Sequence, residues 1–328
     1  MPGRVTLAEA MKNSSPGTSP SPNRAPKLSE MVTLDDRMGY SSIGTSPNSN
    51  QAPEPPGRAT PAEVTGTSSF ESSLKKLDLK PNPAPELVDT ETKVASLVEK
   101  LENLPTNPPS LYIDLEGVNL SRHGSISILQ MHIHPLDETY LVDIHTLQEK
   151  AFSQSAPHSD QTLRAILESP HIPKVFFDVR NDSDALFSHF QINLAGIIDL
   201  QLMELATRYF SKRYVSGLAK CIDRDAPLTA HETRAWKASK ERGLDLFDPK
   251  RGGSYEVFNT RPLPDEIREY CEQDVRFLPK LFVQYQRKMS SFWSKKVITE
   301  SKDRVTLSQT ATYDGKGNHQ ALGPAGWY

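Results

Sequence analysis

The order of apolar and polar residues predicts a chain that alternates strands with helices between residues 90 and 292. Residues 92–104 place Val94, Leu97 and Leu101 at helical spacing, so this segment should pack one face against a sheet. Runs rich in β-branched and aromatic residues, bounded by turn residues, are typical of strands. The expected strands cover 110–117, 125–134, 138–144, 174–179 and 195–199, and the expected helices cover 92–104, 161–169, 182–190 and 201–211.

The first three of these strands should be antiparallel neighbours, because short turns such as residues 135–138 join strands that reverse direction. The later segments alternate strand with helix, which indicates a mixed sheet flanked by helices. We therefore expect an α/β fold with a mixed five-stranded sheet. From about residue 215 onwards a mainly helical C-terminal part should follow.

Composition divides the 328-residue chain into three parts. Residues 1–88 are rich in Ser and Pro, and sixteen of the 26 prolines lie before residue 110. Such a segment buries too little apolar surface to offset chain entropy, so we expect a disordered tail, to which protein partners could bind. Residues 89–292 should form one enzyme-sized domain. Residues 293–328 should finish a helix and then be mostly disordered.

The formal net charge of -3 argues against nucleic-acid binding by bulk charge alone. A local basic track is still possible around Trp236, although acidic residues are interleaved with it. An ordinary charged helix and loop is the alternative interpretation. The candidate basic residues are Arg234, Lys237, Lys240, Arg242, Lys250 and Arg251.

The two cysteines, Cys221 and Cys271, have no C-x-x-C spacing, so neither a disulfide framework nor a zinc site is expected. No stretch approaches about 18 consecutive apolar residues, so we expect no membrane-spanning segment. A reducing compartment follows from this cysteine usage. The expected location is the nucleus or cytoplasm, with the mitochondrion as a minor alternative.

The first candidate for catalytic chemistry is the pair Asp114 and Glu116, at the end of an apolar strand. Side chains at i and i+2 of a strand project from one face, so the two carboxylates should point the same way. Two ionised groups placed so close together are costly unless cations or donors compensate. Divalent cations would do so. A strand end that runs into solvent is the alternative.

Two later motifs could supply partners. After the apolar run that begins at Lys174, three aspartates compete, Asp178, Asp182 and Asp184, and helix capping is the alternative role for each. Tyr270 and Asp274 share one face of a helix at i and i+4, so a phenol and a carboxylate could converge on one water.

Taken together, these motifs resemble the DEDD superfamily of 3′-to-5′ exonucleases, in the subclass whose third motif contains a tyrosine, within the ribonuclease D-like group. Asp114 and Glu116 in DLEGV match its first motif, Asp182 matches the second by its offset from KVFF, and YCEQDV matches the third. The segment NLSRHGSISILQM resembles the Egalitarian-type branch more than bacterial ribonuclease D. Phe177 stands where many family members have histidine.

The resemblance implies an RNase H-like exonuclease fold and hydrolysis of nucleic acid from the 3′ end to nucleoside 5′-monophosphates, with RNA favoured over DNA. It implies two Mg²⁺ or Mn²⁺ ions held by Asp114, Glu116, Asp182 and Asp274, with Tyr270 orienting the attacking water. Residues expected to contact the substrate are Leu115, Gly117, Val118 and Phe177.

Two other functions stay open. The Egalitarian-type branch includes RNA adaptors, so a catalytically weak or inactive RNA-binding protein is the main alternative. A phosphodiesterase that prefers very short oligonucleotides is a third. Two features could be mistaken for the site. Asp199 resembles a family aspartate that is not a metal ligand and should cap the helix that follows it, and the three histidines His132, His134 and His145 lack zinc-motif spacing.

Overall fold

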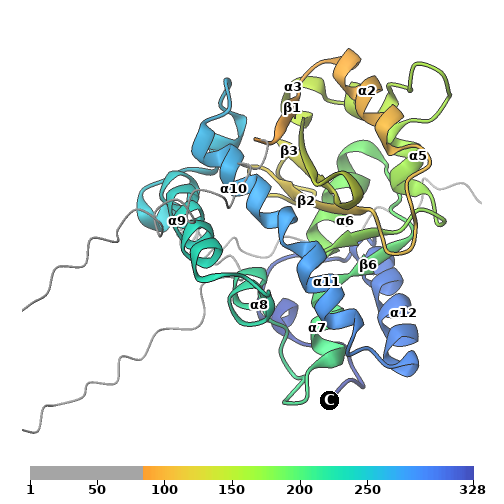
Figure 1. Ribbon diagram of the computed structural model, residues 1–328, viewed down its shortest axis with the longest axis vertical. Coiled ribbons are helices and arrows are strands. Elements are labelled where there is room, and N and C mark those ends of the chain that lie inside the picture. The colour runs from red at the N-terminus through yellow and green to blue at the C-terminus, as the bar shows by residue number, and fades with distance from the viewer. Residues whose placement is uncertain (1–83) are drawn as a thin grey trace, which may run out of the picture. The chain divides into compact units, whose positions relative to one another are not determined.

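A computed structural model describes residues 84–328 (Figure 1). The strands are β1 Glu86–Val88, β2 Leu111–Glu116, β3 Ile128–Ile133, β4 Glu138–Asp143, β5 Lys174–Phe176 and β6 Ile197–Asp199. The helices of the first half are α2 Glu91–Leu101, α3 Ile144–Leu147, α4 Lys150–Ser153, α5 Leu163–Glu168, α6 Arg180–Phe190 and α7 Leu200–Thr207. The second half contains α8 Leu218–Asp225, α9 Ala230–Phe247, α10 Asp265–Arg276, α11 Leu278–Gln286 and α12 Ser291–Ser308.

The strands of residues 84–328 form one mixed sheet in the order β1-β4-β3-β2-β5-β6. The antiparallel arrangement of β2, β3 and β4 is confirmed, with Asp114 opposite Gln130. The sheet has six strands rather than the five expected. The extra strand is β1, which pairs parallel to β4 although it falls in the predicted tail. The rest of the tail prediction concerns residues outside the described range.

Helices cover both faces of the sheet. On one face α2, α4, α5 and α6 bury Ile113 and Leu115 of β2. On the other face α7, α8 and α11 form a second core around Tyr112. α10 crosses β2, β3 and β4 on this second face, as Figure 1 shows. The face of β2 that carries Asp114 and Glu116 is therefore the face that α10 covers.

Local sequence signals explain where the helices near the site begin and end. A capping box starts α9, in which Thr229 and Glu232 each bind the other's backbone N–H. α10 ends at Arg276, and α11 begins directly after Phe277 with Pro279 in its first turn. Pro279 has no N–H to donate to the carbonyl of Val275, and its ring clashes with that carbonyl in a continuous helix, so the hydrogen-bond ladder of α10 stops here.

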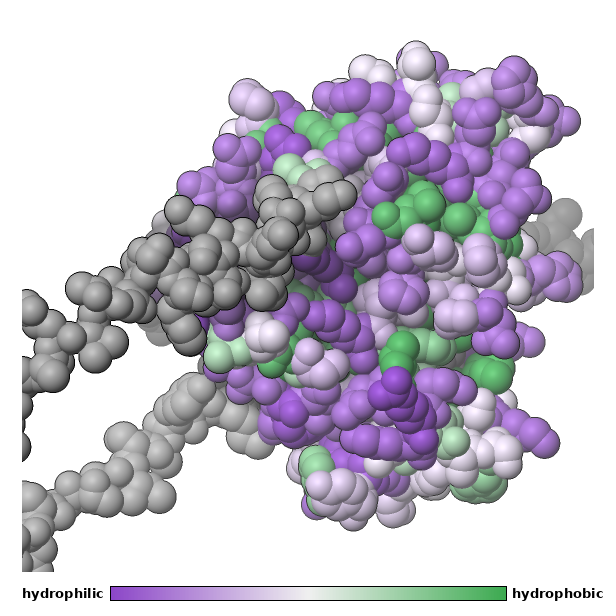
Figure 2. All heavy atoms as spheres, in the orientation of Figure 1, coloured by the Kyte–Doolittle hydropathy of each residue, from purple (hydrophilic) through white to green (hydrophobic). Residues whose placement is uncertain are grey.

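The C-terminal extension is ordered, which corrects the expectation of mostly disordered residues after 293. α12 packs against α6, α7 and β6, and Trp327 is buried against Trp293. Arg304 on α12 also binds Asp199. The sequence of this segment is polar overall, so its few anchoring contacts could not be read from composition. Figure 2 shows a largely hydrophilic surface, and within residues 84–328 no helix combines the length and apolarity needed to cross a membrane.

Candidate active site

Three carboxylates meet on the face of the sheet that α10 covers. Asp114 and Glu116 project from the end of β2, and Asp274 projects from the last turns of α10. One oxygen from each of the three lies within 4.8 Å of the others. The structure thus brings together three of the predicted site residues, from segments about 160 residues apart in the chain.

Packing fixes the height of α10 above the sheet. Ile267, Cys271 and Val275 on the inner face of the helix are fully buried. When the Gln130 side-chain amide is oriented to satisfy both groups, its nitrogen donates to Asp114 Oδ2 (3.3 Å) and to the carbonyl oxygen of Cys271 (3.2 Å). This side chain therefore ties the first and third motifs together.

Asp182 lies in the first turn of α6 and is almost fully buried. Burial raises the pKa of its carboxyl well above the usual value, and the negative charges of Asp114, Asp178 and Glu116 raise it further. Its oxygens are not among those that lie within 4.8 Å of one another, but the charges of Asp114 and Glu116 on β2 act on its carboxyl. An extra positive charge at this place would relieve the repulsion.

The two competing aspartates are already occupied by guanidinium groups. Asp178 accepts two hydrogen bonds from Arg180, each 2.5 Å long. Asp184 accepts from the backbone N–H and the side chain of Arg122, at 2.8 and 2.7 Å. Asp182 is not paired with a guanidinium in this way, and its pKa is raised by burial and by the charges of Asp114 and Glu116, which favours it as the residue of the second motif.

Tyr270 is held from several sides in the same region. Its ring packs edge-on against Phe247, with 4.9 Å between centroids, and a Cβ on Gly243 would lie only 2.6 Å from Tyr270 Cδ2. Lys240 Nζ lies 3.3 Å from the Tyr270 hydroxyl and 3.3 Å from Asp274 Oδ1. Helix α9 thus positions the tyrosine and places a cation next to it.

Lys240 is a site residue that sequence reasoning did not assign. It appeared only as one member of the possible basic track. The structure pairs most of the others with acids: Lys237 with Asp223, Arg242 with Glu269, and Arg251 with Glu241 and Asp245. Within the described residues, this track is therefore an ordinary charged helix and loop, apart from the inward-facing Lys240.

The four residues predicted to contact substrate occupy different settings. Leu115 points away from Asp114 into the opposite core and is 2% exposed, so its position does not support contact with a base. Gly117 is required by close packing, since a Cβ there would lie 2.1 Å from the backbone oxygen of Ser125. Val118 and Phe177 are partly exposed.

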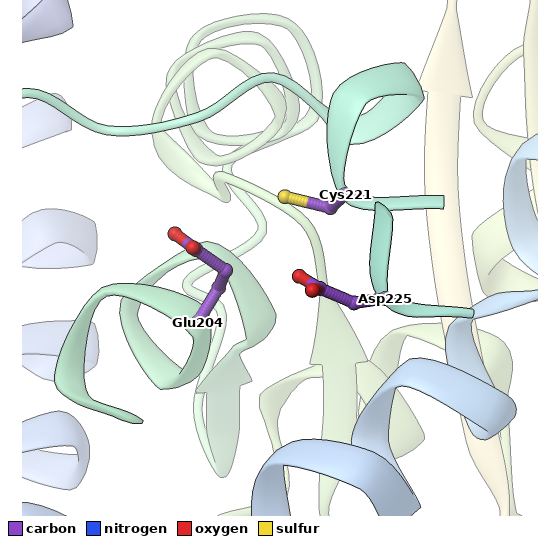
Figure 3. Close-up of side chains that lie close together, drawn as sticks. All are labelled: Glu204, Cys221 and Asp225. Atoms are coloured by element: carbon purple, nitrogen blue, oxygen red, sulfur yellow. The ribbon is translucent and has the colours of Figure 1, made fainter. Parts of the chain in front are cut away.

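A second group of possible ligands, Glu204, Cys221 and Asp225, lies between α7 and α8 (Figure 3). Arg208 and Arg224 both bind Glu204, and Arg224 also binds Asp225 at 2.6 Å. Guanidinium groups therefore already supply its positive charge, and burial raises the pKa of the Cys221 thiol to about 12. This group is better explained as a buried ion-pair network than as a metal centre.

The remaining ambiguous residues have structural partners. Asp199 caps α7 through the N–H of Gln201, as expected. His132 contacts the Thr139 hydroxyl at 3.0 Å. In residues 84–328, the three histidines are not among the groups whose ligand atoms converge for a metal.

The cluster of Asp114, Glu116 and Asp274 fits divalent metal ions. Its donors are hard carboxylate oxygens, which suit Mg²⁺ or Mn²⁺ better than zinc. Burial raises the pKa of the neighbouring Asp182, and the negative charges of Asp114, Asp178 and Glu116 raise it further, so a bound cation would be favoured here. Both observations are those expected of a site that binds cations.

Comparisons with known proteins agree with this geometry. The family model of the 3′-5′ exonucleases matches residues 85–290. The structure is similar to RNase D of Trypanosoma brucei in complex with RNA U12, with 22% identity, a TM-score of 0.57, and coverage of 75% of this chain and 78% of that chain. The GMP complex of that enzyme gives 22% identity and a TM-score of 0.56, over 74% and 70% of the two chains.

At this identity the solved structures show the fold alone, and they confirm the predicted RNase H-like exonuclease fold. No curated protein matches the sequence. The closer resemblance to the Egalitarian-type branch stays a prediction.

Proposed function

Because the chain belongs to the 3′-5′ exonuclease family, we propose that it removes nucleotides from the 3′ end of single-stranded RNA and releases nucleoside 5′-monophosphates. The observation that carries this proposal is the meeting of Asp114, Glu116 and Asp274 beside the Tyr270 hydroxyl, with Asp182 at the edge of the group.

Divalent metal dependence is typical of the family, and we propose two Mg²⁺ or Mn²⁺ ions here. Asp114, Glu116, Asp182 and Asp274 would hold them. Bound divalent ions lower the pKa of the attacking water and stabilise the charge that develops on the leaving 3′ oxygen. Four negative charges match the four positive charges of such a pair, which explains why the site is electrostatically unfavourable in protein alone.

Tyr270 and Lys240 would act on the substrate side of this site. The Tyr270 hydroxyl can accept or donate a hydrogen bond, so it can orient the attacking water. The Lys240 ammonium bonds to both the hydroxyl and Asp274, and it keeps the phenol pointed at the carboxylates. It also adds a positive charge near the place that the scissile phosphate must occupy.

RNA is favoured as substrate because the similar structures of Trypanosoma brucei RNase D were solved with RNA U12 and with GMP. GMP is a nucleoside 5′-monophosphate, which is the product class expected here. Discrimination between RNA and DNA depends on contacts to the 2′ hydroxyl.

An RNA-binding adaptor without catalysis is the second candidate. It is motivated by the resemblance of the segment after β2 to the Egalitarian-type branch. The retention of every carboxylate together with Tyr270 favours catalysis, since a binding protein does not need a costly cluster of like charges.

The test is digestion of 5′-labelled single-stranded RNA and DNA by the full chain, with Mg²⁺, Mn²⁺ or EDTA. Asp274→Asn is the catalytic variant, and Asp223→Asn, an exposed aspartate paired with Lys237, is the matched control. We expect metal-dependent shortening from the 3′ end, preserved in the control and reduced about a thousandfold or more in Asp274→Asn. If the unmodified protein binds RNA tightly but does not shorten it, the result would refute the proposed exonuclease activity and support the RNA-binding adaptor.

A further inference from the structure

An unusual set of aromatic side chains is exposed where α7 ends and α12 begins. Tyr209 is 98% exposed and Phe210 is 52% exposed, in the loop directly after α7. Tyr214 in the same loop is 52% exposed, and Phe292 in the first turn of α12 is 63% exposed. We call this surface, made by residues 208–214 and 292–296, the distal aromatic face.

Positive charges lie directly over these rings. The exposed Arg213 guanidinium lies 5.3 Å from the centre of the Tyr214 ring, whereas the guanidinium over Phe210 is that of Arg208, which is buried and paired with Glu204. Lys212 and Lys296 both lie over Trp293, at 5.3 and 5.1 Å. These contacts join the loop to α12, so the two segments make one continuous surface.

The local charge is strongly positive although the whole chain carries a net charge of -3. The segments 205–222 and 285–298 both contain basic residues. The first contains no acid, since it lies between Glu204 and Asp223. The second segment ends before Glu300 and contains no acid at all. Lys295 is exposed three residues after Phe292, on the same side of the helix.

This face lies away from the carboxylate cluster. α7 starts at Leu200, directly after its cap Asp199, which lies near Asp182, and its eight residues carry the chain about 12 Å to the distal aromatic face. Figure 1 shows this loop at the lower end of the molecule, below α7 and α8 and away from β2 and α10. Figure 2 shows pale and green spheres beside purple ones at the same end.

We propose that the distal aromatic face is a second binding surface for single-stranded nucleic acid, which holds the 5′ part of a strand whose 3′ end occupies the catalytic site. Proteins that bind single strands combine a basic surface with aromatic rings on which bases stack. Both features are present here, and they are paired with one another. The positive charge is complementary to the phosphate backbone. The proposal rests on the proposed function for the position of the 3′ end.

The exposed rings favour this partner over an anionic membrane. A segment that inserts into a membrane needs a wide apolar surface. Here Arg213 lies 5.3 Å from the centre of the Tyr214 ring and Lys296 lies 5.5 Å from the centre of the Phe292 ring, which keeps the surface hydrated. Stacked bases can share such rings without removing the cations.

The test is the affinity of the full chain for a 5′-labelled RNA of about 20 nucleotides, measured by fluorescence anisotropy in EDTA, where cleavage cannot occur. The variant is Tyr209→Ala/Phe210→Ala/Phe292→Ala, and Leu136→Ala, an exposed apolar residue in the turn between β3 and β4, is the control. We expect the dissociation constant of the variant to rise about tenfold or more and that of the control to stay unchanged.

Hydrolysis of a dinucleotide in Mg²⁺ or Mn²⁺ should be equal in variant and unmodified protein, because a dinucleotide cannot reach the face. In Arg213→Ala/Lys295→Ala, the slope of log affinity against log salt should fall by about 0.7 for each phosphate that the variant no longer neutralises. Thermal unfolding checks that the variants are folded.

Unchanged affinity in the aromatic variant overturns the proposal. A second outcome also overturns it. If the aromatic variant loses binding to vesicles of phosphatidylcholine and phosphatidylserine but keeps its RNA affinity, the face binds membranes instead. Binding is measured without metal, so the two proposals can fail separately. If the unmodified protein binds long RNA through this face but never shortens it, the proposed exonuclease activity is refuted and the binding surface is not.

Discussion

Replacement of Arg304 by Met should destabilise the whole domain, because Arg304 neutralises a buried charge. Its Nη1 lies 2.7 Å from Asp199 Oδ2, 3.0 Å from Gln201 Oε1 and 3.5 Å from Asp178 Oδ1. Asp199 is fully buried and Arg304 is 5% exposed. Loss of one partner of such a pair leaves an uncompensated buried charge, at a cost of about 3–5 kcal/mol.

The cost should lie at the lower end of that range. Asp199 keeps three backbone donors, the N–H groups of Asp178, Val179 and Gln201. We therefore expect the free energy of unfolding to fall by about 3 kcal/mol. For a domain of this size that corresponds to a decrease in Tm of about 6–12 °C.

Urea unfolding of the unmodified protein, Arg304→Met, Asp199→Asn and the double variant measures this effect. The double variant removes both charges, so its loss of stability should be smaller than the sum of the two single losses by at least about 1 kcal/mol. Lys302→Met, an exposed cation on the same helix, is the control. A decrease of less than about 1 kcal/mol in Arg304→Met would refute the assignment of Arg304 as the neutralising group.

Three further changes have defined outcomes. Asp182→Asn should raise the Tm of the chelator-treated protein by a few degrees, because it removes a buried carboxyl whose raised pKa disfavours folding as pH rises, and it should abolish nuclease turnover; an unchanged or lower Tm contradicts this explanation. Burial lowers the pKa of His132 to about 4. Below about pH 6.5 the unfolded chain therefore binds a proton that the folded protein does not bind, and the free energy of unfolding should fall by about 3 kcal/mol between pH 6.5 and 4. Urea titrations should show a weaker loss over that range in His132→Gln, and an identical loss in both proteins argues against it. Gly243→Ala should reduce turnover about tenfold by displacing the Tyr270 ring, whereas Ala238→Ser on the exposed face of α9 should not; equal kcat values in the two would exclude this packing role.

Sequence periodicity was sufficient for those parts of the site that depend on one element. Strand alternation placed Asp114 and Glu116 on one face, and helical spacing did the same for Tyr270 and Asp274. The same alternation shows why Leu115 points into the opposite core, which the resemblance to the family did not reveal.

Contacts between elements could not be predicted in this way. Lys240 reaches Asp274 because α9 crosses α10, and no pattern within either helix records the crossing. β1 is a strand of three residues that gains its order from pairing with β4. The choice among the three aspartates after β5 likewise depended on partners elsewhere, since Arg122 lies 62 residues from Asp184.

The contacts of Arg122 have a consequence for synthesis of the protein. Its guanidinium donates to Asp184 and also to the carbonyl oxygen of Ser308, 186 residues later in the chain, at 2.7 Å. During translation at about 5–20 residues per second, β2 therefore leaves the ribosome roughly 10–40 seconds before the partner that locks the following loop. For most of that interval the nascent chain carries Asp114 and Glu116 without Asp274 of α10. The carboxylate cluster of a ribosome-bound chain is therefore incomplete until α10 has emerged.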